Sequence, residues 1–194
     1  METYASDNKG TVYVPVPEVT GDDMAQWFVM RDLSRSNAKE PAWKILEELE
    51  MDYFTPMVQK LVIRNGRREK EKAPYIQDLV FVHESRSALD PIVENVRTFQ
   101  YRYLKRRVPM TVREVDMKRF VRAVESTKFP RFYRPDEITQ DMLRHRIRIV
   151  GGNLDGYEGF LLTVRGSRVK RLLVELPTLL AVSVEVKPEF VQLL

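Results

Sequence analysis

The chain has 194 residues, of which 43% are hydrophobic, and it sets 32 basic residues against 28 acidic ones. That length can bury one good hydrophobic core or two small ones. Cysteine is absent, which excludes disulfides and thiolate metal sites. The net charge of +4 is mild, so a nucleic-acid-binding role must rest on local basic patches.

The N-terminus lacks the basic and apolar regions of a signal peptide, and no apolar run approaches membrane-spanning length. We therefore expect a cytoplasmic protein with no membrane partner. Pro15 and Pro17 interrupt the short apolar run 11–14, so residues 1–25 are predicted to form a flexible leader.

Residues 26–125 alternate between strand and helix signals. Trp27–Met30 is predicted to form a strand, and apolar residues at helical spacing predict a helix from about Asn37 to Glu50. The segment 53–63 and the basic strand after it are joined by Asn65-Gly66, which is a strong hairpin signal.

The rest of this region predicts one central strand and two more helices. Leu79–Val82 is continuously apolar, as expected for a central strand, and a helix over 89–96 and a strand over 99–104 follow. Residues 111–114 read as a capping box that starts the third helix, with Met110 stapled onto Val115. The predicted buried face of that helix consists of Met117, Phe120, Val121 and Val124.

Residues 126–140 contain two prolines and no hydrophobic period, which is typical of an interdomain linker. In 141–194 apolar residues recur at every second position, as in Ile147 and Ile149 or Val182 and Val184. Five short strands separated by turns predict a small all-β barrel. β-branched residues dominate 168–186, so we expect this barrel rather than helices in the free protein.

The segment 149–161 places glycines in a tight turn between two apolar, strand-like runs. It resembles the KOW motif, which occurs in proteins that associate with RNA polymerase and the ribosome. A phosphate-cradling loop is the alternative, but its glycines would open a helix, whereas a strand follows here. The residues of the predicted KOW turn are Gly152, Leu154, Gly156 and Gly159.

The order of all these elements resembles the NusG family of transcription elongation and antitermination factors. The matching segments are Trp27-Phe28-Val29, Thr55-Pro56-Met57, Val80-Phe81-Val82, Pro109-Met110-Thr111 and the KOW turn. The resemblance implies an α+β N-terminal domain over 26–125, with a four-stranded antiparallel sheet flanked by helices, that docks on the clamp helices of RNA polymerase. It also implies an SH3-like KOW domain over 141–194 that recruits other factors, and the sequence leaves open whether the partner is a ribosomal protein, a termination factor or neither.

One segment departs from the family pattern. The family usually carries Phe-Pro-Gly-Tyr just before the central strand, whereas this chain has Ile76-Gln77-Asp78-Leu79. Aliphatic residues thus replace aromatic ones at two positions. The departure suggests a specialised paralogue that acts as an antiterminator on particular operons.

Docking on polymerase requires an apolar patch that the domain core does not use. By the two-residue period, Leu79 and Phe81 share one face of the central strand while Val80 and Val82 share the other. Plain core packing is the alternative for these side chains. The candidate polymerase-binding residues are Ile76, Leu79, Phe81, Phe99 and Tyr101.

The family resemblance also implies contact between the first helix and the non-template DNA of the elongation complex. The candidate nucleic-acid-binding residues are Arg35, Lys39, Trp43, Lys44, Arg102, Lys105, Arg106 and Arg107. A solvated helix face is the alternative near Lys44, because four glutamates lie close by in the sequence. The basic residues of 67–72 alternate with Glu69 and Glu71, which favours a solvated ribbon.

We find no signature of an enzyme, a metal site or a cofactor site. His83 and His145 lie in different predicted domains and neither has a metal-ligand spacing. Two functions remain open: an elongation or antitermination factor that binds RNA polymerase, and a KOW-containing RNA-binding or ribosome-associated protein without a polymerase role.

Overall fold

The computed structural model describes residues 24–35, 40–104, 107–163 and 169–194. The N-terminal part, residues 24–125, contains β1 (Gln26–Asp32), α1 (Ala42–Glu48), β2 (Asp52–Phe54), β3 (Met57–Arg64), β4 (Arg67–Pro74), β5 (Val80–Glu84), α2 (Arg86–Asn95), β6 (Phe99–Tyr101), β7 (Thr111–Val112) and α3 (Glu114–Glu125). The C-terminal part, residues 126–194, contains β8 (Arg131–Tyr133), β9 (Arg146–Ile149), β10 (Glu158–Thr163), β11 (Lys170–Leu176), β12 (Leu180–Val186) and β13 (Val191–Leu193). Four short 3-10 turns lie at 135–137, 140–143, 152–154 and 188–190 of this part.

The N-terminal part is built on an antiparallel sheet with the order β2-β5-β1-β6, and β7 also pairs with β1. The mixture of helices with an antiparallel sheet confirms the predicted α+β class. The sheet has five strands instead of four because Thr111 and Val112 join it as β7. Strands β3 and β4 form a separate two-stranded ribbon.

Helix α1 begins five residues after the predicted start, at Ala42. The carboxylate of Asp32, at the end of β1, accepts hydrogen bonds from the backbone N–H of Ala42 (2.8 Å) and of Ser34 (2.9 Å). A free N–H at a helix start needs such an acceptor. The buried Asp32 therefore fixes where α1 begins relative to the sheet.

The start of α3 differs from the predicted capping box. Residues 111–112 are strand β7, the N-cap is Arg113, and no side chain accepts a hydrogen bond at this cap. Val115 is 64% exposed, so no staple with Met110 forms. Thr111 pairs with Phe28 as part of β7, so it has strand conformation and cannot serve as the N-cap of α3. Burial of Met117 and Phe120 is confirmed.

The C-terminal part is all-β, as predicted. Its antiparallel sheet runs β13-β9-β10-β11-β12-β8, an open path of six strands. Within the described residues no pairing joins β13 to β8, so the expected closed barrel is not confirmed. Strands, and not helices, occupy 170–186.

Three residues of the predicted linker 126–140, Arg131–Tyr133, form the edge strand β8 of this sheet. Strand β8 pairs with β12, placing Phe132 opposite Val182, and Phe132 is 6% exposed. Pro130 and Pro135 flank the strand, which lies at the sheet edge where proline is tolerated. Burial of the Phe132 ring and pairing with β12 thus explain why residues 131–133 form a strand although their sequence has no hydrophobic period.

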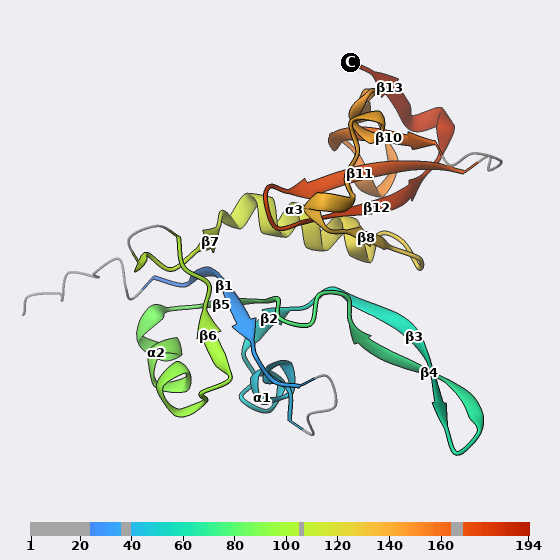
Figure 1. Cartoon of the computed structure of the whole chain (residues 1–194). Coiled ribbons are helices and arrows are strands. Elements are labelled where there is room, and N and C mark those ends of the chain that lie inside the picture. Colours follow the sequence, from blue (N-terminus) through green and yellow to red (C-terminus); the bar gives the residue numbers. More distant parts are fainter. Residues whose placement is uncertain (1–23, 36–39, 105–106, 164–168) are drawn as a thin grey trace, which may run out of the picture.

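Helix α3 lies between the two sheets (Figure 1). Met117, Phe120 and Ala123 have no measurable exposure and belong to one buried cluster that includes residues of both sheets. The N-terminal sheet contributes Val29 and Phe81, among others, to this cluster. The C-terminal part contributes residues of several strands. α1 and α2 cover the other face of the N-terminal sheet with a second core.

No helix within the described residues is both long and apolar enough to cross a membrane.

Phe120→Ala should lower the free energy of unfolding by about 3 to 5 kcal/mol, since it removes a fully buried ring from this cluster. Val115→Ala, on the exposed side of the same helix, should change it by less than about 0.5 kcal/mol. Urea unfolding of both variants measures the difference. Similar effects of the two substitutions would contradict the position assigned to α3.

Candidate functional site

The central strand β5 divides its apolar side chains between two faces, as the two-residue period predicted. Leu79 and Phe81 belong to the cluster around α3, whereas Val80 and Val82 belong to the core under α1 and α2. Leu79 and Phe81 are only 1% and 0% exposed. The face proposed to dock is therefore fully covered in this state.

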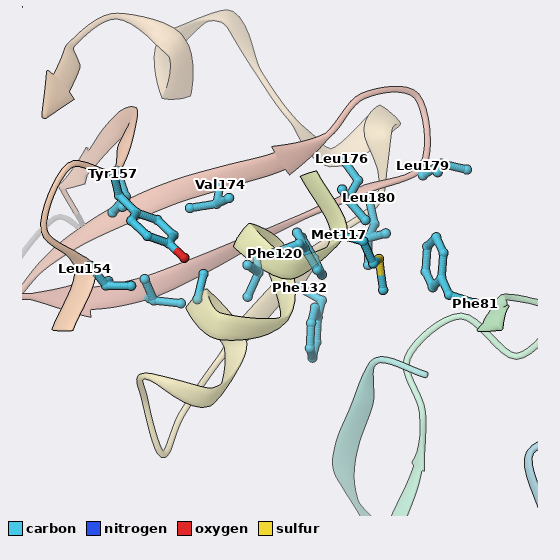
Figure 2. Close-up of a cluster of buried hydrophobic side chains, with 14 of the residues drawn as sticks. Phe81, Met117, Phe120, Phe132, Leu154, Tyr157, Val174, Leu176, Leu179 and Leu180 are labelled. Carbon is cyan, nitrogen blue, oxygen red and sulfur yellow. The ribbon is translucent and has the colours of Figure 1, made fainter. Parts of the chain in front are cut away.

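The cover comes from α3 and from the turn between β11 and β12. Phe81 shares its cluster with Met117 of α3, with Leu179 of that turn and with Leu180 at the start of β12 (Figure 2). Phe54 of β2 completes the contact, because its ring centroid lies 6.2 Å from that of Phe81 and 6.0 Å from that of Phe120. Ile76, at the turn before β5, is half-buried against the same cluster.

Phe99 and Tyr101 do not lie on that face. Met30 of β1 pairs directly with Tyr101, and cross-strand partners project on the same side of a sheet. Both aromatic residues are buried in the core under α1 and α2, where the Tyr101 hydroxyl donates a 2.9 Å hydrogen bond to Asp90. Burial and this bond raise the pKa of Tyr101. The five candidate polymerase-binding residues therefore split between two faces.

Besides this apolar cluster, two groups of polar and aromatic contacts join the N-terminal part to the C-terminal part. In the first, Tyr75 at the end of the ribbon donates a hydrogen bond to Glu137, and its ring centroid lies 5.8 Å from that of Phe132 on β8. Burial, followed by the bond to Glu137, raises the pKa of Tyr75 to about 12. The same bond lowers the pKa of Glu137.

In the second group, Arg119 of α3 contacts Tyr157 and Glu158. These residues follow the turn that contains Gly152 and Gly156, which we call the glycine turn. The Arg119 guanidinium lies 5.1 Å from the ring centroid of Tyr157 and donates a hydrogen bond to the backbone oxygen of Glu158. The hydroxyl of Tyr157 donates in return to the backbone oxygen of Arg119, at 3.2 Å. The glycine turn is therefore held against α3.

The glycines of this turn are required by its backbone. Gly152 and Gly156 have φ of 72° and 77°, in the region that favours glycine. A Cβ at Gly159 would lie 2.2 Å from the backbone oxygen of Leu173 on β11, so only glycine lets the two strands approach. Leu154 is buried in the cluster shared with α3. A pocket of about 350 Å³ opens beside the turn, bordered by Asn153, Lys187 and Phe190 among others.

The basic candidates near α1 are exposed. Arg35 and Lys44 face solvent, and the Lys44 ammonium lies 5.6 Å from the ring centroid of the half-buried Trp43. A base that stacked on Trp43 would meet this cation. Lys39 lies outside the described residues.

The second basic group lies between β6 and β7. Arg102 and Arg107 are exposed, and the loop between them is closed by a 2.8 Å hydrogen bond from the N–H of Leu104 to the oxygen of Val108. Lys105 and Arg106 lie outside the described residues. Tyr103, Leu104 and Val108 are each more than half exposed, so this loop is both basic and apolar.

The two histidines form no catalytic arrangement. His83 stacks on Trp27, with ring centroids 5.0 Å apart, and its nitrogens lie 3.4 Å from Asp52 and 3.3 Å from Glu114. His145 is exposed, next to β9. In the described part of the chain, no group of three or more histidine or acidic residues is arranged so that it could hold a metal ion.

Sequence reasoning missed one buried ion. Arg171 on β11 is 2% exposed and donates hydrogen bonds to Ser183 and Glu185 of β12 and to the backbone oxygen of Phe129. These bonds tie the segment before β8 to the sheet. By the two-residue period Arg171 shares a face of β11 with Leu173 and the exposed Glu175, opposite to Leu172 and Val174, so neither its position nor its charge indicated burial.

An antiparallel sheet packed on three helices, followed by an all-β part, defines a two-part α+β protein. The family model described as "Transcription termination factor nusG" matches residues 25–121, half of the 194 residues. The chain therefore belongs to the NusG family, which gives it a role in transcription elongation or termination.

A solved structure of NusG from Thermotoga maritima, described as showing domain interaction, is 14% identical and covers 89% of this chain and 98% of its own, with a TM-score of 0.46. No curated protein matches the sequence.

The Tyr75–Glu137 contact predicts a pH dependence at both ends of the scale. The contribution of Tyr75 to stability should be complete below its ordinary pKa of 10.0 and should be lost as the pH rises through about 12. The contribution of Glu137 should be complete above its ordinary pKa of 4.5 and should be lost below it. An NMR titration of the tyrosine rings in Glu137→Gln should show the Tyr75 pKa falling while staying above 10, because burial is the larger cause. An unchanged Tyr75 pKa would rule out the bond.

Proposed function

We propose that this protein is a transcription elongation and antitermination factor that binds RNA polymerase through its N-terminal part. The observation that carries the proposal is the family match over 25–121, which contains the whole N-terminal sheet, both flanking helices of its second core and most of α3. The apolar face of Ile76, Leu79 and Phe81 is the surface we assign to the clamp helices of the polymerase. Side chains of this kind, gathered on one face, suit a helical partner.

Phe99 and Tyr101 act in this proposal as support for the sheet and not as contacts. Their burial under α1 and α2 leaves them no route to a partner without unfolding of that core. Ile76 is the most accessible of the five candidates, since it is half-buried at a turn. It is therefore the residue best suited to a test.

Polymerase binding then requires the cover to separate from the sheet. Phe81 is buried by α3 and by the β11–β12 turn, and Tyr75 holds β8 and Glu137 against the N-terminal part. A binding face that is open in only a fraction of molecules has an apparent affinity reduced by that fraction. Separation of α3 and of the β11–β12 turn from this face is thus a step of the proposed function.

Nucleic-acid contact is assigned to the exposed cations beside the sheet. Arg35, which follows β1, and Trp43 and Lys44 in the first turn of α1 are proposed to meet the non-template DNA strand of the elongation complex. Arg102 and Arg107 are proposed to contact phosphates, since their loop contains no acidic residue.

The C-terminal part is proposed to be a KOW module that recruits a second factor, a ribosomal protein or a termination factor. The positive φ of Gly152 and Gly156 and the tight strand contact at Gly159 support this proposal. The segment Ile76–Leu79, which departs from the usual aromatic pattern, supports action on particular operons. The family match on the N-terminal part favours this function over a ribosome-associated role without polymerase.

Ile76→Asp should weaken binding to core RNA polymerase by about 1 kcal/mol or more, roughly fivefold, because it places a charge on the proposed apolar face. Leu49→Asp is the matched control, since Leu49 is 51% exposed at the end of α1, on the other side of the sheet. Affinity is measured by co-purification and by fluorescence anisotropy with the folded full chain. Equal affinities of the two variants would contradict the assigned face.

Tyr75→Ala should strengthen polymerase binding by roughly two- to tenfold, since it removes both the bond to Glu137 and the ring contact with Phe132. Tyr103→Ala removes an exposed ring away from that contact and should leave the affinity within about twofold. A weaker Tyr75→Ala variant would show that the cover does not compete with the polymerase.

A further inference from the structure

The β3–β4 ribbon projects away from both sheets (Figure 1). Each strand has eight residues, paired in register from Met57 with Pro74 to Arg64 with Arg67. Asn65 and Gly66 turn the chain with φ of 51° and 76°, the backbone of a tight hairpin turn. At about 3.3 Å per residue the ribbon is about 25 Å long.

Pairing separates the charges that alternate along the sequence. Residues directly opposite each other project on the same side, so Leu61 lies with Lys70 and Ile63 with Arg68. We call the first side the basic face: it consists of Gln59, Leu61, Ile63, Arg68, Lys70 and Lys72. The opposite side, the mixed face, carries Lys60, Val62, Arg64, Arg67, Glu69 and Glu71.

Both acidic residues of the ribbon thus lie on the mixed face, where Glu71 forms a 3.2 Å ion pair with Arg64. The basic face has three cations and no carboxylate. Within the described residues no ion pair involves Arg68, Lys70 or Lys72. The solvated ribbon expected from interleaved charges therefore describes only one side of it.

The basic face also exposes apolar side chains. Leu61 is 69% and Ile63 is 74% exposed, and they lie beside the cations with nothing covering them. On the mixed face the apolar residues closer to the sheets, Val58 and Ala73, are half-buried. The unpaired cations indicate a binding surface for a polyanion. The exposed aliphatic side chains among them indicate that this ligand also presents apolar groups.

We propose that the basic face of the ribbon binds double-stranded DNA in the major groove. That groove, about 12 Å wide, admits a two-stranded β-ribbon. Arg68, Lys70 and Lys72 then reach phosphates or guanine edges, while Leu61 and Ile63 contact thymine methyl groups. The major groove of an RNA duplex is too narrow for such a ribbon, which selects DNA. The inference goes beyond the proposed function because it uses a different element from the polymerase face.

The two faces provide a matched test. In the full chain, Arg68→Ala, Lys70→Ala and Lys72→Ala remove three charges from the basic face, and Lys60→Ala, Arg64→Ala and Arg67→Ala remove three from the mixed face. Binding to a 20-base-pair DNA duplex is followed by fluorescence anisotropy over a range of salt concentrations. The basic-face variant should bind at least about tenfold more weakly, with a log K against log salt slope lower by about 2 to 3. The mixed-face variant should change affinity less than about threefold.

An uncharged substitution tests groove insertion separately. Leu61→Ser with Ile63→Ser should weaken duplex binding severalfold with the salt slope unchanged, because no phosphate contact is lost. Equal losses in both charge variants would overturn the proposal, since net charge alone would then explain binding. Tighter binding to an RNA duplex or to single-stranded DNA of the same sequence, or no duplex binding by the parent protein, would overturn it too. Polymerase affinity is measured separately, so a failure here leaves the proposed function standing.

Discussion

The structure depends on the burial of α3 on two sides. An isolated helix of 12 residues is marginal in water, so tertiary contacts must hold it. One set comes from the N-terminal sheet, where Phe120 meets Phe54, and the other from the C-terminal sheet, where Arg119 meets Tyr157. Because one helix serves both sheets, the two share a single apolar cluster.

This shared helix also decides which surfaces are accessible. The face with Leu79 and Phe81 lies beneath it, and the glycine turn is held to it through Tyr157. Most of the β3–β4 ribbon is open to solvent, and so are Tyr103, Leu104 and Val108 after β6. In this state the basic face of the ribbon is exposed, whereas the apolar face of Leu79 and Phe81 is buried. Electrostatic attraction to nucleic acid acts over a longer range than apolar contact, so the open surfaces are suited to the first encounter.

Periodicity and turn motifs in the sequence predicted the features that depend on residues close to one another in the chain. The period at Leu79–Val82 gave the two faces of the central strand, and Asn65-Gly66 gave the ribbon turn. Sequence patterns did not predict the segments whose structure depends on pairing with a strand distant in the sequence. Strand β8 has no period of its own and is ordered by β12, and the faces of Phe99 and Tyr101 follow from the register with β1. The separation of charges on the ribbon likewise required its register, although the two-residue period was visible in the sequence.

Native-state hydrogen exchange of the full chain in low denaturant tests the shared core most directly. We expect the slowest amides of β5, α3 and β12 to open with one common free energy, equal to that of global unfolding, because the same cluster holds all three. Exchange of the β12 amides at a clearly lower free energy, with β5 and α3 still protected, would show that the C-terminal sheet opens independently and would contradict the account.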